Sequence, residues 1–320
     1  MTLNRGLLFW GLALITAGAV ALAAQQGYLD KDALRDLWRL WPVILIVIGV
    51  SVVVSRTPFA VVGTVAAALV VGGAGGALIA VGPTLSLNCG TGDPTSLTSR
   101  SGDFGSSAGV ELDFNCGTLS VAMTDNSAWT VASGQRGGDP ARITASSDRL
   151  EVRSPDNGRW WDGGRQRWEV SLPTDSVYTL NASPNAADTT IDLGGGRFSR
   201  VSLNPNAGSL TLDLTDADVE RLELSLNAGS ASVTIGTAMN MRGSLSVNAG
   251  SIQVCTLGGV AVEYTLDSNV AFSHNLDGSG LVRVGDTWST SGYAWAAQQI
   301  RLEISGNAGS FTLNPEGGCG

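Results

Sequence analysis

The sequence has very few of the residues that carry most enzyme chemistry. It contains one histidine, one lysine and four cysteines among 320 residues. Nucleophilic catalysis with a histidine base needs that histidine beside a Ser or Cys, and a zinc site needs Cys and His clustered at short spacing. His274 lies in Phe272-Ser273-His274-Asn275, which we interpret as a surface or loop segment. We therefore predict no enzyme activity, no metal site and no cofactor.

Positive charge is also scarce in the larger part of the chain. After Gly82 there are 14 arginines and 25 acidic residues, a net charge of 14 − 25 = −11. Nucleic-acid affinity rests on Lys and Arg that neutralise phosphates, so this composition excludes a nucleic-acid partner. All four cysteines fall in the same part, and an even number fits disulfides formed in an oxidising compartment.

The N-terminal segment 1–82 contains three long apolar runs, at 7–24, 40–54 and 59–81. A membrane-spanning helix needs about 20 apolar residues. The first and third runs are therefore long enough, and the second is short. We predict a transmembrane helical region over residues 1–82, with three helices and the lipid bilayer as its partner.

The orientation in the membrane rests on a small difference in charge. One side would hold Arg5 and Arg56, and the other would hold Lys31, Arg35, Arg39 and the large domain. This count opposes an external domain, because positive residues favour the inner side. The cysteines and the acidic, lysine-free repeat region favour the opposite orientation, so we expect the large domain on the outer side.

The rest of the chain is organised around one tetrapeptide, Asn-Ala-Gly-Ser, and its variants. Three identical copies follow one another at a constant period, since 227 − 206 = 21 and 248 − 227 = 21. The last copy lies further on by 307 − 248 = 59, close to three periods. A fixed period in the low twenties is typical of a solenoid, in which each repeat packs only on its neighbours. The copies begin at Asn88, Asn115, Asn185, Asn206, Asn227, Asn248 and Asn307.

Apolar and polar residues alternate around these copies, as in Leu210-Thr211-Leu212-Asp213-Leu214, which predicts strands with one face inward. Stacked rungs lie about 4.8 Å apart and place like residues on one another. We therefore predict a ladder of side-chain amide hydrogen bonds, with glycine at a corner of positive φ. Alternatively, Asn and Gly are turn residues of hairpins in an ordinary sandwich. The predicted ladder contains Asn88, Asn115, Asn206, Asn227, Asn248 and Asn307.

These patterns together predict a membrane-anchored all-β protein. We expect residues 83–320 to form a single-stranded β-solenoid with rungs of about 21 residues and a projecting loop at 154–167. The last rung would span Ile300 to Leu313. The segment 314–318 would then stop further strand addition at an open edge.

The cysteines allow two interpretations. Cys89 and Cys116 occupy the same place in the repeat, where other copies have Ala. On adjacent rungs, their Cα atoms would fall near the ~4.4–6.8 Å window for a disulfide; otherwise they are two small buried thiols. Cys255 and Cys319 could pair with each other or link to another chain.

The loop at 154–167 contains Trp160 and Trp161 together with three arginines. Exposed tryptophans beside arginines are a candidate contact with a partner or with lipid headgroups. The alternative is that the loop is a lid over the first rungs of the solenoid, which also need to be covered.

Two family resemblances follow from these motifs. Phe9-Trp10-Gly11, Gly27-Tyr28-Leu29 and Leu40-Trp41-Pro42 resemble the transmembrane region of the LiaI/LiaF-type envelope-stress proteins, over about residues 5–55. The third apolar run departs from that pattern. The Leu-Xaa-Leu-Asn-Ala-Gly-Ser rungs resemble the adhesin-like β-solenoids called toastrack domains, over roughly residues 85–314. The resemblance implies a membrane-tethered sensor or scaffold without enzyme activity, and it assigns no functional residue.

We therefore expect a multi-pass protein of the bacterial cell membrane that presents a β-solenoid to a protein partner in an envelope-stress signalling system. A surface adhesin, or a solenoid that self-associates end to end, is the alternative. A carbohydrate-active β-helix enzyme is disfavoured, because the outward positions of the regular rungs are mostly Ser and Thr.

Overall fold

The computed structural model describes residues 11–12, 15–16, 94, 96–136, 138–155, 164–236, 239–268, 271–316 and 318. The chain separates into two compact units, Met1–Leu85 and Ser86–Gly320. In the first unit residues 11–12 and 15–16 are helical, and the Thr16 hydroxyl donates to the Leu12 carbonyl at 2.8 Å. The predicted runs 40–54 and 59–81 lie outside the described residues. Within the described part of the chain, no helix combines the length and apolarity that a membrane crossing requires.

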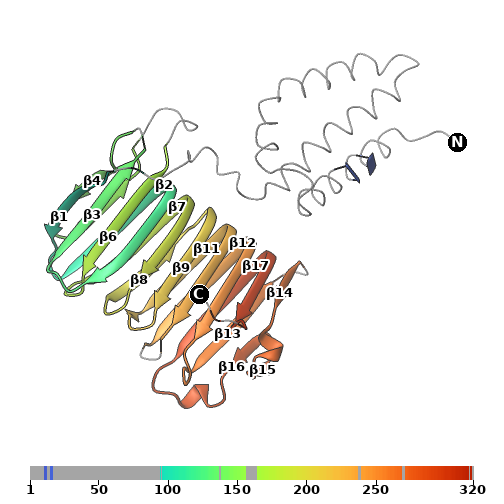
Figure 1. Cartoon of the computed structure of the whole chain (residues 1–320). Coiled ribbons are helices and arrows are strands. Elements are labelled where there is room, and N and C mark those ends of the chain that lie inside the picture. Colours follow the sequence, from blue (N-terminus) through green and yellow to red (C-terminus); the bar gives the residue numbers. More distant parts are fainter. Residues whose placement is uncertain are drawn as a thin grey trace, which may run out of the picture. The chain divides into compact units, whose positions relative to one another are not determined.

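The second unit, which we call the β domain, is built almost entirely from strands, so the predicted all-β class is confirmed there (Figure 1). Two single-turn 3₁₀ helices, η3 (Leu276–Gly278) and η4 (Tyr293–Trp295), interrupt the later strands. The strands are β1 (Thr98–Asp103), β2 (Ser107–Thr124), β3 (Ala128–Gln135), β4 (Arg142–Ala145), β5 (Arg149–Arg153), β6 (Gln166–Pro173), β7 (Val177–Asp192), β8 (Arg197–Leu203), β9 (Ala207–Leu214), β10 (Asp218–Val219), β11 (Arg221–Ile235), β12 (Met241–Thr256), β13 (Val262–Ser268), β14 (Phe272–His274), β15 (Val282–Val284), β16 (Thr287–Ser289) and β17 (Ile300–Leu313).

The centre of the β domain is a stack of parallel strands in register (Figure 1). In β11 and β12, Leu224 pairs with Leu245 and Ala228 with Ala249, the same offset that separates Asn227 from Asn248. This offset also relates β9 to β7 and β11 to both β8 and β9. The period in the sequence therefore equals the step from one rung to the next. Parallel pairing here excludes the alternative in which these Asn and Gly residues turn hairpins.

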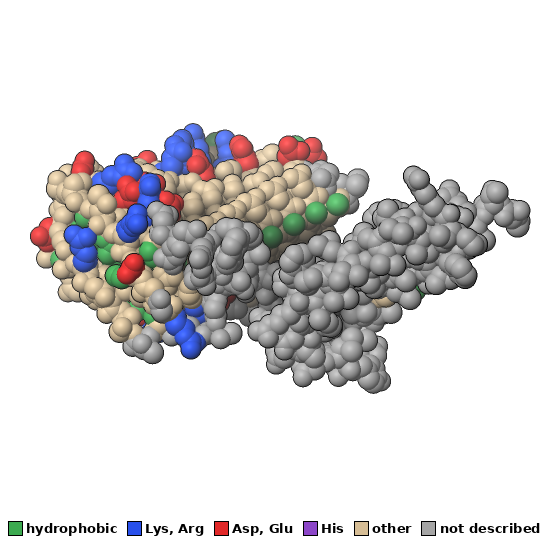
Figure 2. Space-filling model, turned by 90° about the horizontal axis from the view of Figure 1, so that it is seen from above, with side chains coloured by type: hydrophobic (Ala, Val, Ile, Leu, Met, Phe, Trp, Pro, Cys, Tyr) green, Lys and Arg blue, Asp and Glu red, His purple; other side chains and the backbone are tan. Residues whose placement is uncertain are grey.

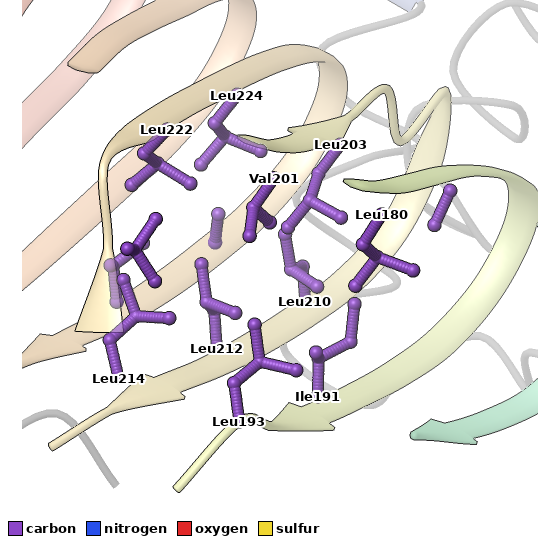
Figure 3. Packing of buried hydrophobic residues seen from close by; sticks show 14 of the residues in the cluster. Leu180, Ile191, Leu193, Val201, Leu203, Leu210, Leu212, Leu214, Leu222 and Leu224 are labelled. Carbon is purple, nitrogen blue, oxygen red and sulfur yellow. The ribbon is translucent and has the colours of Figure 1, made fainter. Parts of the chain in front are cut away.

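Each rung has two halves that face each other across the core. Figure 3 shows Val201, Leu203, Leu222 and Leu224 from the first halves pointing toward a second row of leucines and one isoleucine. All ten labelled side chains in that view are at most 2% exposed. Burying one such side chain contributes about 1.5–3 kcal/mol, so the repeated rows supply the main stabilisation of the stack. The second row contains Leu210, Leu212, Leu214, Ile191 and Leu193.

Glycine occupies the corner between the two halves in β2, β9, β11, β12 and β17, whereas β7 has Ala187 there. Gly229 has φ = +120° and Gly250 has φ = +142°, which a residue with a Cβ rarely adopts. A Cβ at Gly229 would also overlap the carbonyl oxygen of Gly208 on the neighbouring rung, and one at Gly250 would overlap that of Gly229. A side chain at Gly229 or Gly250 would therefore prevent neighbouring rungs from approaching to sheet spacing at this corner.

The rungs are not stacked in chain order. β2 lies between the rung formed by β5 and β6 and the rung formed by β7. β17 lies between β12 and the pair β13 and β14. The expectation that Ile300–Leu313 forms an open edge is therefore wrong: the segment 257–299 folds past this strand and pairs with its far side. Asn307 accordingly follows Asn248 directly, although their separation in the sequence is close to three periods.

Antiparallel strands cover both ends of the stack. At one end β3 pairs with β1 and β6, and β4 pairs with β5. At the other end β16 pairs with β13 and β15. The Arg283 guanidinium lies 4.6 Å from the centroid of the Trp288 ring in this second group. The outermost layers are thus short antiparallel strands rather than further parallel rungs, which limits strand addition at the edges.

Candidate interaction surface

The Asn side chains at the corners form a continuous hydrogen-bonded column on the surface. Each Nδ2 donates to the Oδ1 of the Asn on the preceding rung. The distances from Asn185 to Asn115, Asn206 to Asn185, Asn227 to Asn206, Asn248 to Asn227 and Asn307 to Asn248 are 3.2, 2.5, 2.6, 2.7 and 2.8 Å. Each interior carboxamide donates one hydrogen bond and accepts one within the column. The column therefore links neighbouring rungs and mainly stiffens the corner.

The column differs from the predicted ladder by one described member. It includes Asn185, which is not among the predicted ladder residues and whose copy reads Asn-Ala-Ala-Asp. The corner there continues through Ala187, and the Ser209 hydroxyl donates to the Asp188 carboxylate at 2.9 Å. Asn88 lies outside the described residues, so its place in the ladder remains a prediction.

A second column, of arginines, runs along the outward face of the first halves. Arg221 pairs in register with Arg242, and Arg242 with Arg301. Arg200 stands beside Arg221, because Val219 pairs with Phe198 and Leu222 with Val201. We call Arg200, Arg221, Arg242 and Arg301 the arginine column. This column is not among the features predicted from the sequence, although Arg200, Arg221 and Arg242 recur at the same period as the asparagines.

The two ends of the arginine column are paired with carboxylates. Arg200 lies 2.9 Å from Glu223, and Arg301 lies 2.7 Å from Glu263. The charge of Glu263, helped by Tyr293, raises the pKa of Arg301 above its ordinary value. Arg221 and Arg242, in the middle, form no ion pair with any residue that the structure describes.

In a second charged cluster, at the start of the stack, both arginines are paired with carboxylates. Arg149 contacts Glu111 at 2.6 Å and Glu151 at 3.2 Å, and Arg153 contacts Asp113 at 3.3 Å. Exposed pairs of this kind each contribute about 0–1 kcal/mol. Figure 2 shows acidic and basic side chains gathered together along one margin of the β domain, beside a mostly uncharged surface. This surface therefore presents polar and charged groups to the solvent.

The cysteines are partly described. Cys116, in β2, and Cys255, in β12, are each disulfide-bonded. Cys89 and Cys319 lie outside the described residues. The pairing of Cys89 with Cys116 therefore remains a prediction, as does that of Cys255 with Cys319.

Trp160 and Trp161 also lie outside the described residues, so neither interpretation of the loop at 154–167 is tested. The two flanks of this loop are joined by a buried hydrogen bond of 2.7 Å from the Ser154 hydroxyl to Gln166 Oε1. The sequence analysis missed another tryptophan, Trp295 in η4, whose side chain is 91% exposed. It belongs to the irregular segment 257–299, where no periodicity indicates which residues face outward.

His274 lies on β14 and is half-buried against Trp288, with ring centroids 5.3 Å apart. Its Nδ1 is buried and has no hydrogen-bond partner among the described residues. The neighbouring Ser273 hydroxyl donates to the Gly309 carbonyl at 3.4 Å rather than to the histidine. In the described ranges no three His, Cys, Asp or Glu residues are grouped closely enough to hold a metal ion.

Two family models match the chain. Residues 8–53 match the LiaI-LiaF-like transmembrane region, and residues 101–236 match the N-terminal domain of toast_rack (DUF2154). Both resemblances predicted from the sequence are confirmed by these matches. No curated protein matches the chain.

Solved structures show more distant likenesses. One, of a proposed cell adhesion protein from Clostridium sporogenes ATCC 15579, has 14% identity and a TM-score of 0.44, and the match covers 68% of this chain and 99% of that one. Another, of a proposed adhesin from Bacteroides fragilis NCTC 9343, has 9% identity and a TM-score of 0.26, over 70% of this chain and 100% of that one.

Proposed function

We propose that this chain, a LiaI-LiaF-like transmembrane region joined to a toastrack domain, is a sensor or scaffold in the response of a bacterial cell envelope to stress. The observation that carries the proposal is the presence of both regions in one chain, at residues 8–53 and 101–236. The coarser statement, a membrane-associated envelope protein, follows from the first match directly. The sensor role, the multi-pass topology and the outer position of the β domain are parts of the proposal.

The form of the β domain supports a role in presentation rather than catalysis. We infer a single-stranded β-solenoid whose regular rungs follow one another at a constant offset, interrupted by the segments 125–176 and 257–299. Its outward side chains are held at fixed spacing by the register of the strands. A surface of this kind suits a protein partner, because ordered side chains lose little conformational entropy on binding. We propose no enzyme activity for it.

The second candidate function is self-association end to end, as in an adhesin or a polymer of solenoids. It is favoured by β15, an edge strand whose Val282 and Val284 are 53% and 75% exposed. Sedimentation of the full chain in detergent over a hundredfold range of concentration separates the two candidates. A scaffold remains at one mass, whereas an end-to-end polymer grows with concentration.

The outer position is tested by surface labelling of whole cells. Thr211 is exposed on β9, so a Thr211→Cys variant presents a thiol on the β domain. A membrane-impermeant maleimide should label this variant in intact cells to the same extent as in lysed cells. The parent chain is the control for its own cysteines. Labelling that appears only after lysis contradicts the outer position.

The stress role is tested by comparing two deletions. A chain without residues 97–320 keeps the transmembrane region, and a full deletion removes both parts. If the β domain carries the role, the two strains should show the same loss of the transcriptional response to cell-wall antibiotics. A normal response in the strain that keeps only residues 1–96 contradicts the proposal.

A further inference from the structure

The middle of the arginine column lines a groove in the outer face of the β domain. The groove has a volume of about 460 Å³. Its lining includes Arg221, Arg242 and Arg301 together with Asn240, Gln299 and Tyr293. These residues come from three adjacent rungs and from η4, so the folded stack alone brings them together.

The groove wall is held in place by its own hydrogen bonds. The backbone N–H of Gln299 donates to Asn240 Oδ1 at 2.9 Å. The side-chain Nε2 of Gln299 donates to the Tyr293 carbonyl at 3.0 Å. Tyr293 is itself buried, with 8% of its surface exposed. The wall therefore does not depend on Arg221 or Arg242 for its position.

The register places like charges directly beside one another. Neighbouring parallel strands are about 4.8 Å apart, so the bases of the Arg221 and Arg242 side chains share that spacing. Like charges at directly opposite positions destabilise a sheet. The adjacent positive charges of Arg221 and Arg242 therefore oppose folding, although the domain as a whole is negatively charged. Because a bound anion would relieve this repulsion, the pair indicates an anion-binding site.

The nearby acids leave these two arginines unmatched. Glu223 and Glu263 are used by Arg200 and Arg301 at the ends of the column. Glu220 lines the groove, and Glu303 lies two residues beyond Arg301, but neither forms an ion pair within the described part of the chain. The two central guanidinium groups are therefore paired with no carboxylate among the described residues.

We propose that Arg221 and Arg242 form a binding site for a phosphate group that carries two negative charges, as in a phosphomonoester or a diphosphate. Each guanidinium offers five N–H donors in a planar fork that matches phosphate oxygens in bidentate fashion. A single carboxylate would neutralise one of the two charges, whereas a dianion neutralises both. The site lies outside the corner column and requires no step of the stress role proposed above.

The test uses the full chain in nanodiscs of phosphatidylcholine. Inorganic diphosphate is titrated by calorimetry in one arm, and in a second arm the nanodiscs are exposed to vesicles that contain phosphatidic acid. Saturable binding in the first arm identifies a soluble phosphate ligand, and binding in the second arm alone identifies a lipid headgroup. Either result supports the site if it depends on the two arginines.

Dependence on the arginines is measured with matched variants. We expect Arg221→Gln and Arg242→Gln each to weaken binding by about tenfold or more, because each removes a charge-assisted bidentate contact. Arg242→Lys should bind with intermediate affinity, since it keeps the charge and loses the fork. Arg149→Gln, which removes an exposed arginine that is already paired with carboxylates, should bind within about twofold of the parent. Thermal unfolding of each variant verifies that the β domain is intact.

Three results would overturn the inference. The first is the absence of saturable binding in both arms. The second is an equal loss of affinity in Arg149→Gln, which would reduce the effect to net charge. The third is tighter binding of a hexaglutamate peptide than of diphosphate at the same ionic strength, which would assign the groove to an acidic protein segment.

Discussion

Replacing Gly229 by alanine should destabilise the β domain strongly, because two independent constraints meet at this corner. The φ of +120° is rarely adopted by a residue with a Cβ, and enforcing such a conformation costs about 1–3 kcal/mol. The added Cβ would also overlap the carbonyl oxygen of Gly208, so the two rungs must separate at the corner. Separation weakens the hydrogen bonds of Asn227 on either side, each worth about 1 kcal/mol.

The expected total is therefore about 3–5 kcal/mol, since strain and hydrogen-bond loss add within one corner. For a domain of this size, 1 kcal/mol corresponds to a shift of about 2–4 °C in the melting temperature, so we expect a decrease of about 6–20 °C. The measurement is thermal unfolding of the full chain in detergent, followed by near-ultraviolet circular dichroism.

The matched control is Gly258→Ala, which makes the same change where a Cβ would meet nothing within 4 Å. We expect its melting temperature to remain within about 2 °C of the parent, as for ordinary surface substitutions. A Gly229→Ala chain that melts as the control does would refute the argument that glycine is needed for close approach of the rungs.

Three further predictions concern the corner column, the core and the inserted strand. Asn227→Ala removes two hydrogen bonds of the column and should lower the free energy of unfolding in urea by about 1–2 kcal/mol. The control, Thr211→Ala on the exposed face of β9, should lower it by less than about 0.5 kcal/mol. Equal effects of the two variants would contradict a stabilising role of the column. The Tyr264 hydroxyl is buried without a partner among the described residues, and burial raises its pKa. Above pH about 10 the tyrosine ionises in the unfolded chain but stays protonated in the folded one, so the parent should lose stability as the pH rises. Tyr264→Phe should lose less stability over the same pH range. Parallel stability–pH profiles of the two proteins would contradict a raised pKa of Tyr264. Deleting Ile300–Gly320 removes a strand from inside the stack and should abolish cooperative unfolding and protease resistance, whereas a protected fragment ending near residue 299 would show that β17 is dispensable.

The regular part of the fold could be predicted because its physical cause is local. Strands that alternate apolar and polar residues, with Asn and Gly at a fixed period, place like residues on one another wherever the offset is constant. The position of Asn227 between Asn206 and Asn248 follows directly from that spacing. Asn185 fits the same spacing and belongs to the column, although its tetrapeptide is degenerate and the predicted ladder does not include it.

The order of the rungs at the two ends could not be predicted in the same way. Asn248 and Asn307 are far apart in the sequence, as are Asn115 and Asn185, yet each pair is adjacent in the column. A period constrains neighbours only while no segment is inserted between them. Whether β13 packs before or after β17 depends on which pairing buries Tyr264 and Phe311 together, and these residues come from segments without a repeat.

The arginine column, unlike the order of the rungs, has a periodic signal in the sequence from which it could have been predicted. Arg200, Arg221 and Arg242 keep the same spacing as the asparagines. In a stack with constant offset, any residue type that recurs at the period becomes a column on one face. The charges could thus have been placed together from the sequence, although the groove beside them depends on Tyr293 and Gln299 in the irregular segment.

The placement of β2 and β17 inside the stack also restricts how such a protein can lengthen during evolution. A duplicated unit added after β17 would find no free strand edge there, because β17 already pairs with β12 on one edge and with β13 on the other. A unit duplicated within residues 177–256 would enter between rungs of equal offset and extend both columns by one member. Homologues of different length should therefore gain or lose whole repeat units in this interval, while the segments that form the two ends stay constant.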